Sequence, residues 1–193
     1  MKRQSPFLRA IAAGVIAVAA LTAGAARARA QYAVFDADAA LQVFHERVES
    51  YAALHRRLAP PPSSMTSTDP LSKLLTRQYL ASALRSTRRY SQQGEIFSPE
   101  IATLFRKLLA PTLKGERGKD AKSVLKDDAP ATVSFKINAK YPSSAPLPTV
   151  PSNLLLALPT LPKALDYRIV GKHLILRDVD ADIIVDVLPN AIR

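Results

Sequence analysis

The stretch that decides the fold reads YRIVGKHLILRDVDADIIVDVL and spans residues 167–188. Apolar and polar side chains alternate on both sides of Gly171-Lys172, and a period of two is typical of half-buried β-strands. Glycine accepts the positive φ that a two-residue hairpin connection requires. The stretch therefore predicts an antiparallel meander with strands at 166–170, 173–177 and 182–188 and a polar turn at 178–181.

A fourth strand is expected upstream of the meander. Val133, Phe135 and Ile137 alternate with polar residues over 132–140, which indicates a strand with one apolar face. The connection at 142–162 contains six prolines and is expected to follow the surface.

Three helices are predicted before the strands. In residues 39–59 the apolar positions recur at spacings of three and four, and His55 occupies one position of that stripe. Residues 99–110 carry the clearest stripe, with Ile101, Leu104, Phe105, Leu108 and Leu109 on one face. We expect this helix to cover the sheet face that carries Val133, Phe135 and Ile137, because both surfaces are apolar.

The middle helix is ambiguous. Asp69-Pro70 has the form of an N-cap followed by proline in the first turn, so a helix over 71–90 is expected. Its apolar residues spread widely around the helical wheel. This pattern fits either a largely buried helix or a segment that is not helical.

Helices followed by antiparallel strands predict an α+β fold, with about three N-terminal helices packed on a sheet of about four strands. A single domain is expected over residues 31–193. It would comprise a helical part at 36–112, a linker at 113–130 and a β-rich part at 131–193.

Residues 1–30 have the three parts of a secretory signal peptide. Residues 1–9 are basic, residues 11–26 are apolar apart from Thr22, and Ala28-Arg29-Ala30 is a small-x-small cleavage site. The apolar run is shorter than the roughly 20 residues of a membrane-spanning helix. We therefore expect export to the periplasm or medium, cleavage before Gln31, and no stable membrane span afterwards.

Composition excludes several classes of site. The chain has no cysteine, which rules out disulfides, cysteine-based metal centres and thiol catalysis. Cleavage would remove five basic residues and no acid, so the net charge falls from +11 to +6. This mild basicity in an exported protein favours an envelope protein or an anionic envelope polymer as partner over nucleic acid. No phosphate-binding glycine loop is present, and no cofactor is expected.

Two segments resemble known sequences. LPKALDYRIVGKHLILRD at 161–178, continued by IIVD at 183–186, is similar to the C-terminal region of a group of uncharacterised bacterial exported proteins. GEIFSPE at 94–100 is similar to a segment that precedes a helix in the same group. The resemblance covers about half of the mature chain. It implies a bacterial, exported protein and carries over no catalytic residue.

Asp178, Asp180 and Asp182 are the candidate metal ligands, because their spacing matches the start of a calcium loop. An EF-hand then requires glycine at the sixth position and glutamate at the twelfth, where this chain has Ile183 and Pro189. We therefore interpret the three aspartates as a solvated turn between strands and expect no metal site. His45 and Glu49 share a helix face, but two ligands do not make a site.

A basic cluster at the end of the middle helix comprises Arg85, Arg88 and Arg89, with Lys73 and Arg77 nearby. One interpretation is a face that binds anions or an acidic partner. The other is favourable placement of cations at a helix C-terminus, with no ligand.

Hydrolase motifs such as Gly-x-Ser-x-Gly and His-Glu-x-x-His are absent from the sequence. We therefore expect a binding domain of the bacterial envelope rather than an enzyme. The alternative is a small hydrolase whose site is built from Asp178, Asp180, His173 or Asp186, with catalytic roles unassigned. A calcium-stabilised structural module is a third interpretation.

Overall fold

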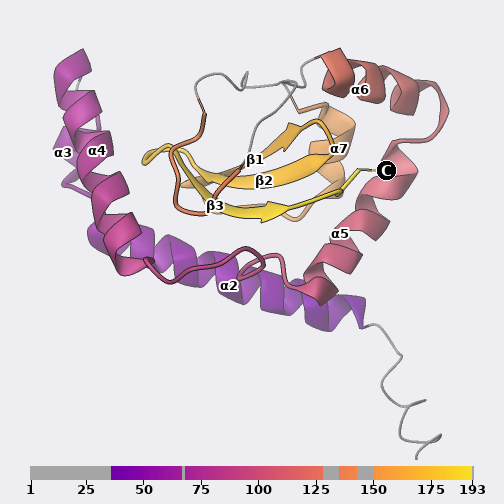
Figure 1. Ribbon diagram of the computed structural model, residues 1–193, viewed down its shortest axis with the longest axis horizontal. Coiled ribbons are helices and arrows are strands. Elements are labelled where there is room, and N and C mark those ends of the chain that lie inside the picture. Colours follow the sequence, from indigo (N-terminus) through magenta and orange to yellow (C-terminus); the bar gives the residue numbers. More distant parts are fainter. Residues whose placement is uncertain (1–35, 67, 128–134, 143–149, 193) are drawn as a thin grey trace, which may run out of the picture. The chain divides into compact units, whose positions relative to one another are not determined.

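The computed structural model describes residues 36–66, 68–127, 135–142 and 150–192, so the predicted signal peptide and Gln31 lie outside the described residues. Residues Ala37–Arg193 form one compact unit. Its elements are helices α2 (Ala37–Leu58), α3 (Pro62–Met65), α4 (Pro70–Thr87), α5 (Pro99–Thr112), α6 (Gly115–Asp127) and α7 (Ser152–Ala157), then strands β1 (Leu165–Val170), β2 (His173–Asp178) and β3 (Ile183–Leu188) (Figure 1).

The predicted meander is confirmed. The three strands form an antiparallel sheet in the order β1-β2-β3. Val170 pairs with His173 across the two-residue connection, and Gly171 has a φ of 56°. A side chain beyond Cα would be strained at this φ, which explains why glycine occupies the turn. The α+β class is also confirmed, with three strands where we expected about four.

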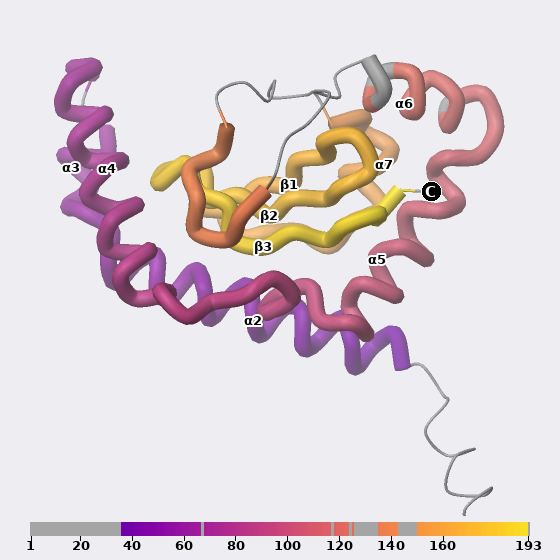
Figure 2. Tube along the Cα trace, in the orientation of Figure 1, coloured from indigo at the N-terminus to yellow at the C-terminus, as the bar shows by residue number. Residues whose placement is uncertain are grey.

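The predicted fourth strand is only a short contact in its described part. Residues 135–142 form a turn and a single bridge, Lys140 to Ile183, at the outer edge of β3 (Figure 2). Asn138 turns the chain with a φ of 63°, and its N–H donates to the carbonyl of Ile184 at 2.8 Å. A positive φ is incompatible with a continuous strand, and asparagine tolerates it better than most residues. Val133 lies outside the described residues.

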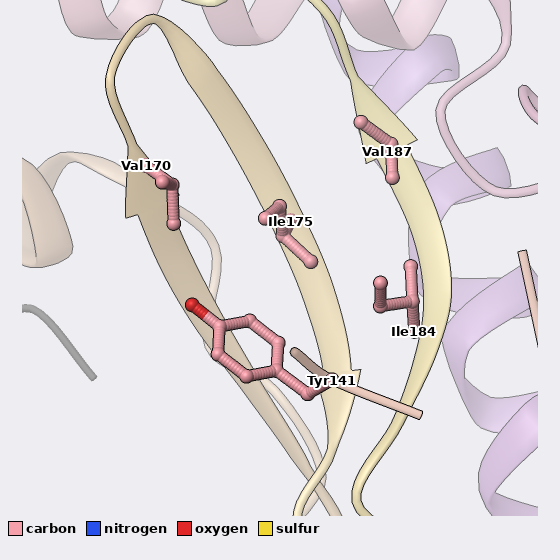
Figure 3. Close-up of a cluster of buried hydrophobic side chains, with 5 residues drawn as sticks. All are labelled: Tyr141, Val170, Ile175, Ile184 and Val187. Atoms are coloured by element: carbon pink, nitrogen blue, oxygen red, sulfur yellow. The ribbon is translucent and has the colours of Figure 1, made fainter. Parts of the chain in front are cut away.

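The predicted packing of the third helix was wrong. Phe135 and Ile137 pack instead against a cluster on the other face of the sheet, made by Tyr141, Val170, Ile175, Ile184 and Val187 (Figure 3). The α5 helix meets the opposite face, where the rings of Phe105 and Tyr167 lie 6.2 Å apart. Phe105 also contacts Phe44 of α2, with ring centres 4.9 Å apart. The segment at 135–142 therefore covers one face while α2 and α5 cover the other.

An irregularity in the pairing of β2 with β3 explains a second difference between the expected and the observed sheet. The register between β2 and β3 shifts between Leu176 and Arg177, so Leu176 pairs with Asp186 while Arg177 pairs with Ile184. A bulge of this kind adds a residue to one strand and changes which side chains share a face. The sequence predicts one shared face for Ile183 and Val187, but the shift separates them. Ile175 and Arg177 share one face of the sheet, and both are buried.

The helices follow the predicted stripes closely. In α2 the stripe from Phe44 to His55 is buried, and α5 buries Ile101, Leu104, Phe105 and Leu109. The expected linker at 113–130 is largely the helix α6, which buries Ala121 and Leu125. Its two glycines and mixed charges favoured a loop, but contacts of these apolar residues with the rest of the unit stabilise a helix.

Candidate functional site

Asp178 is a fully buried carboxylate where we expected a solvated turn, and this is the main correction to the predicted sites. Its Oδ2 accepts hydrogen bonds from the Tyr51 hydroxyl at 2.8 Å and from Nδ1 of His55 at 2.6 Å. Its Oδ1 accepts the N–H of Ala181 at 2.8 Å. The sequence placed His55 in a buried stripe but gave no sign of Asp178 as its partner.

His55 lies between two carboxylates. Its Nδ1 contacts Asp178, and its Nε2 lies 3.3 Å from Oδ2 of Asp180. Ionised carboxylates only accept hydrogen bonds, so the geometry favours the imidazolium, which donates from both nitrogens. The hydrogen bonds to Asp178 and Asp180 raise the pKa of His55 to about 9. Burial, together with the neighbouring Asp178, raises the pKa of the Tyr51 hydroxyl.

Asp186 is a second fully buried carboxylate, and it holds a loop. Its oxygens accept backbone N–H groups from Gly94 at 2.9 Å, Ile96 at 2.7 Å and Phe97 at 2.8 Å, and from its own strand neighbour Val187 at 2.7 Å. These four hydrogen bonds use both oxygens of Asp186, so no acceptor site is left for a ligand. Asp186 therefore fastens the 94–97 segment to β3.

These placements separate His173 from Asp178, two residues of the hydrolase alternative. His173 opens β2 and Asp178 ends it, roughly 16 Å apart at the rise of a β-strand. His173 and Asp178 also lie on opposite faces, since five positions separate them. Asp178 and Asp186 are both fully engaged by the protein. The structure therefore keeps His173 apart from Asp178, while Asp178 and Asp180 both contact His55 instead.

The three aspartates of the predicted metal motif diverge as well. Asp178 faces Tyr51 and His55, Asp180 faces the other side of His55, and Asp182 lies 3.5 Å from Arg177. Among the described residues, no group of three or more histidine, aspartate or glutamate side chains is arranged to hold a metal ion. His45 and Glu49 are exposed on α2.

The three arginines of the predicted anion face do not act as one surface. Arg88 is buried, and its guanidinium donates to the side chain of Asn138 at 2.8 Å and to the carbonyl of Val185 at 3.1 Å. Arg85 donates to the carbonyl of Asn138 at 2.9 Å, and Arg89 stacks over Tyr90. Arg85 and Arg88 therefore connect α4 to the 135–142 turn and β3.

Part of the exposed surface of α4 is apolar. The helix begins as predicted, with the Asp69 carboxylate accepting the N–H of Ser72 at 2.7 Å and Pro70 in the first turn. It is not largely buried: only Leu80, Ala81 and Leu84 are. Four large side chains instead face solvent with exposed fractions from 47% to 63%: Leu71, Leu74, Leu75 and Tyr79. We call these four residues the α4 stripe.

The sequence and contacts of α4 explain the stripe. Leu71, Leu75 and Tyr79 are spaced four apart and share one face of the helix. Arg77 lies on the side of the buried residues and donates to the carbonyl of Asp180 at 3.3 Å. The apolar residues of α4 spread widely around the helical wheel because they lie on two faces of the helix with different roles. One packs in the domain, and the other has no cover among the described residues.

Comparison with family models, with curated proteins and with solved structures finds no match for this chain. Over the described residues, no helix combines the length and the apolar character that crossing a membrane requires.

Proposed function

We propose that the chain is a non-enzymatic binding domain of the bacterial envelope, and that the α4 stripe is its contact surface. The partner we propose is a protein segment that presents apolar side chains flanked by carboxylates. The observation that supports this is the exposure of three leucines and a tyrosine on one helix. Clustered exposed apolar residues of this kind mark interaction sites.

The energetics favour a partner on this surface. Water contact of apolar area costs roughly 25 cal/mol per Å², so covering the stripe stabilises a complex. Tyr79 is 63% exposed, and tyrosine is among the residues that dominate binding energy at interfaces. The leucines lie in the turns of the helix before Tyr79 and would extend the apolar contact.

The basic charge of α4 indicates which kind of partner would bind it. Residues 70–87 contain Lys73, Arg77 and Arg85 and no acid. A basic helix attracts an acidic segment during encounter and disfavours a basic one. An anionic polymer would satisfy the charge but leave the leucines in water. The stripe therefore favours an amphipathic, acidic segment of another envelope protein.

Export rests on the N-terminal sequence, which has basic, apolar and small-residue parts in order. The expected mature protein begins at Gln31 in the periplasm or medium. Intact-mass measurement of the native protein tests this. A soluble product that retains Met1–Ala30 would contradict it.

A peptide-display selection against the purified domain tests the contact surface. We expect recovered peptides to combine apolar residues at helical spacing with a net negative charge. Their binding should fall at least tenfold with Leu75→Lys or Tyr79→Ser. Leu156→Lys is the matched control, because Leu156 is 87% exposed on α7 and the substitution changes charge equally.

Peptides that bind the Leu75→Lys variant as well as they bind the wild type would contradict the proposal. Equal losses with Leu75→Lys and Leu156→Lys would do the same, since they would show a general charge effect. Circular dichroism and thermal unfolding of each variant establish that the fold is retained.

A further inference from the structure

The half of α4 that carries the stripe lies outside the core. Of the described residues 71–79, none is buried, and the buried positions of the helix begin at Leu80. The short helix α3 contacts α4, and Arg77 adds a hydrogen bond to the sheet, donating from Nε to the carbonyl of Asp180 at 3.3 Å. A helix segment without core contacts is free to move unless such surface contacts hold it, so the bond of Arg77 helps to set the position of the stripe.

Asp180 connects that bond to a buried histidine. It lies in the turn between β2 and β3, and its Oδ2 is 3.3 Å from Nε2 of His55 on α2. Its own carbonyl accepts the hydrogen bond of Arg77 on α4. Asp180 therefore joins α2 on one side to the stripe-bearing half of α4 on the other, and a movement of the turn would reach both helices.

The groups around His55 make this link depend on one proton. Nδ1 of His55 lies 2.6 Å from Asp178, which also accepts the Tyr51 hydroxyl. From α4, the guanidinium of Arg88 lies 5.1 Å from the centre of the Tyr51 ring. An imidazolium donates to Asp178 and Asp180 at once, whereas a neutral imidazole has a single N–H and can donate to one of them.

Loss of the proton would break the contact with Asp180 and keep the contact with Asp178. The Asp178 side chain is fully buried, whereas the Asp180 side chain is 41% exposed and can be solvated instead. A neutral His55 with its N–H on Nδ1 presents a lone pair on Nε2 to the Asp180 carboxylate, and the two repel. The hydrogen bonds to both aspartates raise the pKa of His55 to about 9, so the link is intact at neutral pH and is lost as the pH rises through about 9.

We propose that His55 and Asp180 position the half of α4 that carries the stripe, so that presentation of this contact surface depends on the proton of His55. At neutral pH the imidazolium holds Asp180, Asp180 holds Arg77, and the stripe keeps one position. Above pH 9 the first contact is lost and the stripe gains freedom. The functional meaning of this coupling rests on the proposed function of the stripe, but the coupling itself requires no partner.

Distances between pairs of spin labels on the mature chain test the coupling, and the absence of cysteine from the sequence allows labels at chosen sites. One pair joins Leu75→Cys on the stripe to Glu49→Cys on α2, both at exposed positions. We expect its distance distribution to be about twice as wide at pH 10 as at pH 7. In His55→Gln the wide distribution should already be present at pH 7. The control pair, Ser86→Cys with Glu49→Cys, reports on the packed end of α4 and should keep its width.

Arg77→Met breaks the same link at its other end without a change in the interior. It should widen the Leu75–Glu49 distribution at pH 7, and the His55→Gln/Arg77→Met double variant should be no wider than either single variant, because both act on one link. Lys73→Met is the matched control, since Lys73 is exposed, lies four residues earlier on the same face and loses the same charge.

No binding partner enters this measurement, so its outcome is separate from that of the peptide selection. Circular dichroism at pH 7 and pH 10 establishes that each variant stays folded. Equal widths of the Leu75–Glu49 distribution at pH 7 and pH 10 would overturn the proposal. Equal widening by Arg77→Met and Lys73→Met, or equal widening of both label pairs at pH 10, would also overturn it.

Discussion

The sheet face under α2 buries two carboxyl groups, whereas the outer face of α4 exposes apolar side chains. The covered sheet face contains the carboxyl groups of Asp178 and Asp186 at zero exposure, each engaged by hydrogen bonds. The outer face of α4 places leucine and tyrosine in water. Burying a carboxylate is tolerable only when it is paired, and exposing apolar residues is favourable only when a partner covers them. Hydrogen-bonded carboxyl groups therefore contribute to the fold alongside the apolar core, and the exposed apolar groups of α4 are available for binding.

The largest expected effect tests the buried side of this comparison. In Asp186→Asn, one carboxylate oxygen becomes an NH₂ group that faces backbone N–H donors. The free energy of unfolding should fall by about 4 kcal/mol, since buried donors lose their acceptor. Denaturant unfolding measures this, and hydrogen exchange should show faster exchange at Ile96 and Phe97.

Asp120→Asn is the control for that variant, because Asp120 is exposed on α6. It should change the unfolding free energy by less than about 0.5 kcal/mol. A loss below about 1 kcal/mol in Asp186→Asn would show that the carboxylate is not what holds the 94–97 segment.

The second-largest expected effect is on the pH dependence of the free energy of unfolding. The folded-state pKa of His55 is about 9, raised from 6.5. The folded protein therefore binds the proton of His55 more tightly than the unfolded chain does. This contribution to the free energy of unfolding is complete below pH 6.5 and is lost as the pH rises through about 9. The shift corresponds to about 3 kcal/mol. His55→Gln should remove most of this pH dependence, as measured by denaturant unfolding at pH 6, 7.5 and 9.5.

His45→Gln is the matched comparison, because His45 lies on the same helix and is exposed. It should leave the pH dependence of the wild type intact. If both variants retain the loss of stability between pH 6.5 and 9, another group is responsible and the bridging role of His55 is wrong.

The smallest expected effect on stability comes from a comparison of the exposed and the buried faces of α4. Leu75→Ala on the α4 stripe should change stability by no more than about 0.5 kcal/mol. Leu84→Ala, at a fully buried position of the same helix, should cost about 2–5 kcal/mol. Thermal unfolding of the two variants measures the difference, and similar losses would show that the stripe is covered within the domain.

The local elements could be predicted from the sequence, because each depends on neighbouring residues. Gly171 specifies the hairpin, Asp69-Pro70 specifies the start of α4, and the stripe around Phe105 specifies α5. Pairings between distant segments could not be predicted. The contact of His55 with Asp178 joins residues 123 positions apart, and no local pattern records it.

The errors have specific physical causes. The bulge after Leu176 exchanges the faces of β3, and alternation alone cannot locate a bulge. The left-handed turn at Asn138 ends what alternation suggested was a strand. For α4, hydrophobicity does not distinguish a leucine that packs internally from one that faces solvent.

The hydrogen bonds of Asp186 to the 94–97 segment also determine when that segment can fold during synthesis of the chain. It joins Ile96 to a residue 90 positions later, and the Asp178 contact with Tyr51 spans 127 positions. Both acceptors lie in the last two strands, so α2 and the 94–97 segment cannot gain these bonds until β2 and β3 have left the ribosome. Contacts between such distant residues slow folding because a long loop must close first. We therefore expect nascent chains that end before β3 to remain open to proteases.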